Sequence, residues 1–93
     1  MRDLSELENK FIKMIFTSRR IPYDPIFRPQ LEILSEIGSF SGQQILDISI
    51  ELERRGLIEM TREPSGAGQR TGGVARIQFT QRGVDYASAL MQL

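Results

Sequence analysis

Histidine and cysteine, which supply most general bases, nucleophiles and metal ligands in proteins, are both absent from this 93-residue sequence. An enzyme built on this chain would have to rely on carboxylates, Ser, Lys or Tyr. Carboxylate pairs such as Glu6 with Glu8 and Glu51 with Glu53 stand two residues apart. On a helix such residues point to different sides, so we interpret them as solvated charges rather than acid–base pairs. We therefore expect no enzyme, no catalytic residue, no metal site and no cofactor.

The chemistry that remains is recognition by charged and amide side chains. The net charge is +0, but residues 1–53 carry −3 and residues 54–93 carry +3. The basic residues of the second part are all arginines, whose planar guanidinium suits forked contacts with phosphates and guanine. These residues are Arg54, Arg55, Arg62, Arg70, Arg76 and Arg82. Their concentration on one predicted helix and one predicted hairpin favours phosphate binding, with surface solubility charges as the alternative.

A helix over residues 42–55 must position the first of these arginines. Ser41 and Gln44 fit a capping box at its start, and Gly56 suits the left-handed position that ends it. Helical spacing predicts an inner face of Ile45, Ile48, Ser49 and Leu52. The opposite face then carries Gln43, Asp47, Ile50 and Arg54.

Three further segments surround this helix. Ser5 and Glu8 fit a capping box for a first helix over about residues 5–18. Residues 21–25 contain two prolines and predict a short strand or extended bridge. A second helix begins near Pro29 and ends at Gly38. The inward residues expected on these two helices are Leu4, Leu7, Phe11, Met14, Ile15, Leu31, Leu34 and Ile37.

Two apolar-patterned runs, residues 57–62 and 74–79, predict paired strands. The Gly-rich stretch of residues 64–73 between them reads as the hairpin loop. Thr80 can cap a last helix that starts at about Gln81, with Val84, Ala87, Ser88 and Met91 facing inward. The expected order is helix, short strand, helix, helix, β-hairpin and C-terminal helix, which makes an α+β fold.

Two segments of this pattern resemble known proteins. Leu52-Glu53-Arg54-Arg55-Gly56-Leu57-Ile58 resembles the junction between recognition helix and wing in MarR-type and PadR-type winged-helix regulators. Phe79-Thr80-Gln81-Arg82-Gly83, followed by Ala87 and Leu90, is similar to their return from strand to helix. The resemblance covers about residues 29–90. It implies a small winged helix-turn-helix domain that binds double-stranded DNA as a transcription regulator.

In such a domain the third helix enters the major groove and the hairpin, or wing, contacts the DNA backbone or minor groove. Gln can bond adenine edges, Arg can bond guanine or phosphate, and Ile can contact a thymine methyl. The expected DNA-binding residues are Ser41, Gln43, Gln44, Asp47, Arg54, Arg62, Gln69, Arg70 and Arg76. A solvated helix face and a plain hairpin connection are the alternatives.

A second hypothesis is a winged-helix module for protein–protein interaction within a larger assembly, without direct DNA binding. Leu46 and Ile50 would lie at the centre of that contact, because exposed apolar residues on an ordered helix often mark a partner surface. The balanced net charge and the carboxylates Asp47 and Glu51 also suit this hypothesis.

The first and last helices carry more apolar residues than one small core needs. The extra ones are Ile12, Phe16, Tyr86, Leu90 and Leu93. We expect them to form a homodimer interface, because the resemblance implies that lone winged-helix domains dimerise through their terminal helices. Packing of one stripe against the other within a single chain is the alternative.

The length fits one domain over residues 1–93. No apolar run approaches the roughly 20 residues of a membrane helix, and no apolar segment near the start resembles a signal peptide. We therefore expect a cytoplasmic protein with no membrane partner.

Overall fold

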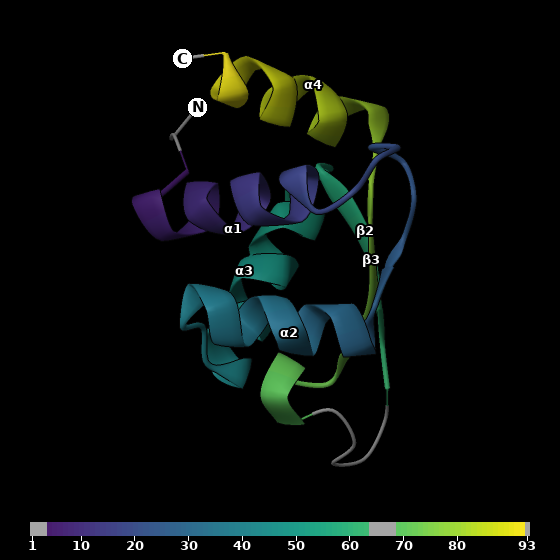
Figure 1. The fold of residues 1–93 in the computed structure, drawn as a ribbon. Coiled ribbons are helices and arrows are strands. Elements are labelled where there is room, and N and C mark those ends of the chain that lie inside the picture. Colours follow the sequence, from purple (N-terminus) through teal and green to yellow (C-terminus); the bar gives the residue numbers. More distant parts are fainter. Residues whose placement is uncertain (1–3, 64–68, 93) are drawn as a thin grey trace.

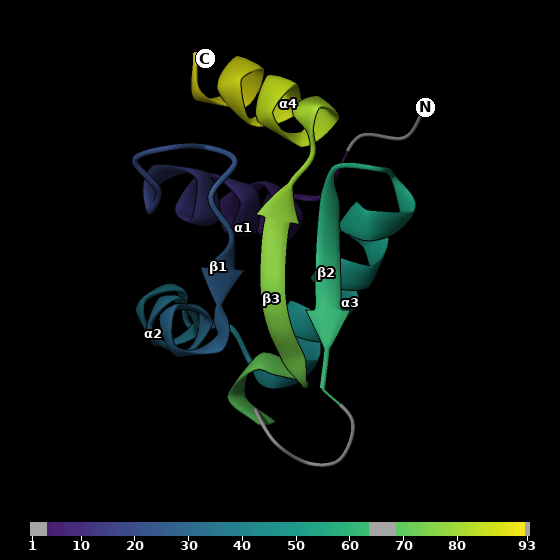
Figure 2. The same ribbon diagram turned by 90° about the vertical axis from the view of Figure 1, so that its right-hand side faces the viewer.

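A computed structural model describes residues 4–63 and 69–92, which form a small α+β domain. Within these residues there are four α-helices, three strands and one short 3-10 helix. In chain order they are α1 (Glu6–Thr17), β1 (Ile26–Phe27), α2 (Arg28–Gly38), α3 (Gly42–Arg54), β2 (Ile58–Arg62), η1 (Gln69–Thr71), β3 (Val74–Phe79) and α4 (Gln81–Met91). The helices α1, α2 and α3 lie on one side of the sheet, and α4 lies beyond α1 (Figures 1 and 2).

The helix ends form where the local sequence places them. The capping boxes at Ser5 and Ser41 are both present, and Thr80 caps α4 by accepting a hydrogen bond from the backbone of Gly83. At the end of α3, Gly56 has a φ of +76°, and the Leu57 N–H donates to the Leu52 carbonyl over 3.0 Å. This is the Schellman closure that the sequence predicts.

The strands form one antiparallel sheet in the order β1-β3-β2. Ile26 and Met60 both pair with Ile77 on the side of the helices, while Phe27 and Thr61 pair with Arg76 on the opposite side. The first strand lies one residue beyond the expected stretch of residues 21–25, which forms a turn instead. Two prolines without N–H groups cannot supply a ladder there, so pairing starts after Pro25.

A single apolar core lies between the sheet and the helices. Its fully buried members include Phe11, Ile15, Leu31, Ile45, Leu52, Val74 and Ile77. The inner face expected for α3 is confirmed, because Ile45, Ile48, Ser49 and Leu52 are all buried.

Three residues expected in the core are exposed instead. Leu7, Ile37 and Met91 keep 38%, 72% and 44% of their surface open. Leu7 and Met91 lie beside the buried stripes of α1 and α4, so there the covered face is narrower than expected. Ile37 instead follows the exposed Ile33 on the outward side of α2, away from the buried Leu31, Ser35 and Gly38, so the predicted inner face of α2 is wrong at its C-terminal end.

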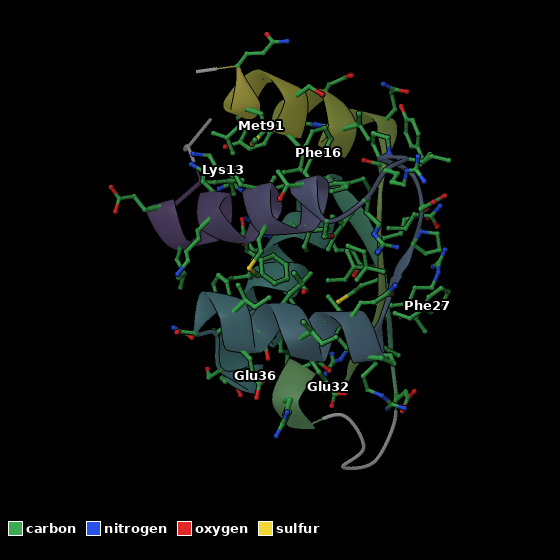
Figure 3. The ribbon with its side chains drawn as sticks, in the orientation of Figure 1. Lys13, Phe16, Phe27, Glu32, Glu36 and Met91 are labelled. Atoms are coloured by element: carbon green, nitrogen blue, oxygen red, sulfur yellow. The ribbon has the colours of Figure 1, made fainter. Side chains whose placement is uncertain are left out.

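The expectation that the apolar stripes of α1 and α4 are surplus to the core is wrong. Ile12 is only 1% exposed, and Phe16 packs edge-on against Phe79 with ring centroids 6.0 Å apart. The Tyr86 hydroxyl donates to Asn9 over 2.8 Å, and Leu90 packs on the core. Figure 3 shows Phe16 in the space between the two helices. Thus the stripes cover one another within one chain; Leu93 lies outside the described residues.

Among the described residues, none of the helices has the length and apolar character needed to cross a bilayer.

Candidate functional site

The outward face of α3 is open, as its spacing predicts. Gln43, Asp47, Ile50 and Arg54 are exposed along it. The Gln43 amide donates to the Asp47 carboxylate over 2.8 Å, so the two side chains form one polar unit on the first two turns. This face joins a hydrogen-bonding amide, a carboxylate, an apolar side chain and a guanidinium in a row along one helix.

The first turn of α3 is occupied by its own cap. The Gln44 N–H donates to Ser41 Oγ over 3.1 Å, and the Ser41 N–H donates to Gln44 Oε1 over 2.8 Å. A ligand at this end could therefore use the Ser41 O–H and the Gln44 amide nitrogen, while the oxygens that accept these bonds stabilise the helix.

A three-membered ion-pair cluster lies at the last turn of α3. Glu51 accepts from Arg54 over 2.6 Å and from Arg55 over 2.7 Å. Hydrogen bonds from Arg54 and then Arg55 lower the pKa of Glu51 to about 2, and the same contact raises the pKa of Arg54. Any phosphate that approaches Arg54 must compete with this carboxylate. The i, i+3 and i, i+4 spacing of the three residues was visible in the sequence, but its consequence for Arg54 was missed.

The end of the hairpin folds back onto the turn between α2 and α3. Figure 1 shows η1 directly below α2 and next to the start of α3. Thr71 is fully buried, and its hydroxyl donates to the Val74 carbonyl over 2.8 Å. At Gly72 the chain comes so close to α3 that a β-carbon would lie 2.3 Å from the Gly42 carbonyl oxygen. This part of the hairpin is therefore attached to the helix pair.

Arg70 stands on that attached segment and is well exposed. Its Nη1 lies 3.6 Å from Glu36 Oε1, and both side chains keep about two-thirds of their surface open. The two residues border an open hollow of about 400 Å³ that is also lined by Ser39, Ser41 and Gly42. Arg70 and the N-terminus of α3 are thus brought together, with Glu36 as a carboxylate that sequence reasoning did not place there.

The remaining residues that were expected to bind DNA lie in different parts of the surface. Arg62 is exposed at the end of β2. Arg76 pairs with Gln78 on the sheet face that points away from the helices, the side from which Phe27 projects in Figure 3. Arg76 is therefore not brought to the open face of α3. Gln69 begins η1, and residues 64–68 of the predicted hairpin loop lie outside the described residues.

The two apolar residues proposed as a protein contact differ in access. Ile50 keeps 42% of its surface open. Leu46 is half-buried, and a β-carbon on Gly72 would lie 2.7 Å from its own β-carbon. The folded-back hairpin thus covers part of Leu46, which corrects the expectation that it is free for a partner.

In the described part of the chain, no three acidic side chains gather in a way that could hold a metal ion. Comparisons of the chain with protein-family models, with curated proteins and with solved structures found no match.

Proposed function

We propose that this chain is a winged helix-turn-helix domain that binds duplex DNA as a transcription regulator. The supporting observation is that α3 has an open outward face, and that the end of the hairpin around η1 lies against the N-terminus of α3. The element order, the strand order β1-β3-β2 and the short connection of residues 39–41 between α2 and α3 agree with this topology.

In this proposal α3 lies in the major groove. Gln43 exchanges its contact with Asp47 for an adenine edge, and Ile50 packs on a thymine methyl. Arg62 and Arg70 contact phosphates from the hairpin side, and the exposed position of both guanidinium groups suits this role. Phosphate contacts fix the register of the helix, while Gln43 and Ile50 carry the sequence preference.

Salt titration of DNA binding tests this mode. We expect Arg70→Ala to weaken binding to all duplexes and to reduce the slope of log affinity against log salt by about one unit. Gln43→Ala should change the preference among sequences and leave the slope nearly intact. Arg20→Ala is the matched control: it removes the same charge from the exposed loop of residues 18–25, at the opposite end of the sheet from η1 (Figure 2).

Equal salt slopes for the wild type, Arg70→Ala and Arg20→Ala would refute this docking mode. No salt-dependent binding of the wild type to any duplex would refute DNA binding itself.

A protein-interaction module is the second candidate, and the charges on α3 favour it. Asp47, Glu51 and Glu53 outnumber the two arginines at the end of the helix, and both arginines are bound to Glu51. Such a face attracts phosphate less than a basic one does. The exposed Ile50 would then be the anchor for a partner protein. Loss of partner capture on Ile50→Asp, in a protein without salt-dependent DNA binding, would support this candidate.

A further inference from the structure

The guanidinium group of Arg54 is held along one edge and open along another. Its Nε and Nη2 donate to the two carboxylate oxygens of Glu51 over 3.1 Å and 2.6 Å. This contact occupies the side edge of the planar fork, while Nη1 and the second N–H of Nη2 form its far edge. Among residues 4–63 and 69–92, Arg54 makes no other hydrogen bond or ion pair. The far edge therefore keeps two parallel donors for a ligand.

Glu51 is itself fixed by a second arginine. Its Oε2 also accepts from Nε of Arg55 over 2.7 Å. The exposed fraction of the side chain rises from 14% at Arg55 through 26% at Glu51 to 70% at Arg54. A largely buried cation thus anchors the carboxylate, and the carboxylate orients the exposed guanidinium. Since an exposed ion pair contributes little to stability, the main consequence of this cluster is the fixed orientation of Arg54.

Arg54 lies on the same open face of α3 as Gln43 and Ile50. It follows Ile50 by four residues and Gln43 by eleven, which places it about 6 Å and about 16 Å from them along the helix axis. Around the axis the three residues lie within roughly 40° of one another. Figure 2 shows α3 at one side of the molecule, with no other element beyond it. A groove that receives Gln43 and Ile50 therefore also faces Arg54.

The charge of the cluster distinguishes the acceptors that Arg54 could bind in DNA. Hydrogen bonds from Arg54 and Arg55 lower the pKa of Glu51 to about 2, so its carboxylate is charged at neutral pH. A phosphate would bring a full negative charge close to this carboxylate, and like charges repel. Guanine instead presents two neutral acceptors, N7 and O6, side by side on its major-groove edge. The cluster thus favours a guanine over a phosphate, and by the same reasoning over a carboxylate of a partner protein.

We propose that Arg54 reads a guanine in the major groove and that Glu51 is the residue that positions it. The inference rests on the proposed function, because it requires α3 to bind duplex DNA. The far edge of Arg54 donates to N7 and O6 of the guanine while Glu51 keeps the side edge. Such a contact neutralises no phosphate and releases no counterion. Arg54 therefore contributes to the sequence preference of binding and not to its salt dependence.

Selection of tight-binding sequences from a random duplex library, followed by salt titration on the selected duplex, tests the role of Arg54. The wild type should select a guanine that Arg54→Ala no longer requires, with the other selected positions retained. Replacing that G·C pair by A·T should weaken binding by roughly tenfold or more for the wild type and by less than about twofold for Arg54→Ala. The salt slope of Arg54→Ala should equal that of the wild type, whereas the slope of Arg70→Ala should fall by about one unit.

Glu51→Gln tests the positioning role. An amide has one acceptor oxygen and no charge, so it cannot hold both donors of Arg54, and the released guanidinium can contact a phosphate. We expect this variant to lose most of its preference for guanine and its salt slope to rise by about one unit. Glu53→Gln is the matched control: it removes the same charge from the same helix, but Glu53 accepts from the Met60 N–H and not from Arg54. Urea unfolding of each variant verifies that folded proteins are compared.

The outcomes separate this inference from the proposed function. A wild type that binds duplexes with salt dependence but selects no guanine through Arg54 would overturn the inference alone. A salt slope lowered by one unit in Arg54→Ala, which would make Arg54 a phosphate contact, would do the same, as would a full guanine preference in Glu51→Gln. If the wild type binds no duplex with salt dependence, the proposed function and this inference both fail.

Discussion

Gly72 attaches the end of the hairpin to the N-terminus of α3, and its replacement by alanine should loosen that attachment. Its φ is +63°, in the left-handed region. An added β-carbon would lie 2.3 Å from the Gly42 carbonyl oxygen and 2.7 Å from the Leu46 β-carbon. Gly42 is the first residue of α3, so its carbonyl is held by the helix and cannot rotate away.

Two costs add at this position. The left-handed backbone costs an L-residue about 1–2 kcal/mol. Overpacking against a fixed neighbour costs about 1–3 kcal/mol. The free energy of unfolding of Gly72→Ala should therefore fall by about 2–5 kcal/mol.

Gly73→Ala is the matched control. Gly73 also has a positive φ, +85°, but its nearest atom to an added β-carbon is the Glu63 carbonyl oxygen at 3.6 Å, an ordinary contact. The free energy of unfolding of this variant should fall only by the backbone cost of about 1–2 kcal/mol. Urea unfolding of the two variants in parallel measures the difference, which should be about 1–3 kcal/mol. Equal losses would show that the close approach of Gly72 to α3 relaxes freely, and the reasoning would fail.

Three further predictions follow from packing and charge. Leu52→Ala should lower the free energy of unfolding by about 2–5 kcal/mol, because Leu52 is fully buried, whereas Ile50→Ala on the exposed side should change it by less than about 0.5 kcal/mol in a urea melt. The pKa of Glu51 is lowered from 4.5 to about 2, so the stabilisation from its ion pairs is complete above pH 4.5 and is lost as the pH falls through about 2. Glu51→Gln should remove that part of the dependence of the free energy of unfolding on pH. If urea melts of the wild type and the variant lose the same stability between pH 4.5 and pH 2, the prediction is contradicted. Phe16→Glu with Leu90→Glu should unfold the chain rather than yield a stable monomer, as circular dichroism would reveal, since both side chains lie between α1 and α4.

Elements bounded by local interactions were predictable from the sequence. The capping boxes at Ser5 and Ser41 and the Schellman closure at Gly56 involve residues only a few positions apart. Their geometry is therefore set before any tertiary contact forms. The bounds of β2 and β3 also match the apolar-patterned runs to within one residue, whereas β1 lies after the expected stretch of residues 21–25.

The candidate site was predictable only in part. Helical spacing correctly placed Gln43, Asp47, Ile50 and Arg54 on the open face of α3. It did not show that Glu51 holds Arg54, although that contact is local and could have been found from its spacing. Alternation placed Arg76 on the uncovered face of its strand, but it did not show that this face points away from the open face of α3.

The sequence by itself determined which segments become the four helices and the two strands of the hairpin, and which side of α3 faces inward, because spacing within one element sets the direction of its side chains. The tertiary structure decided the rest. Whether Ile12 and Leu90 are spare or covered, whether Ile37 is inside or outside, and where Arg70 and Glu36 meet all depend on pairs of positions far apart in the chain. Such contacts follow from how the loops bring the elements together, and no pattern within a single element contains that information.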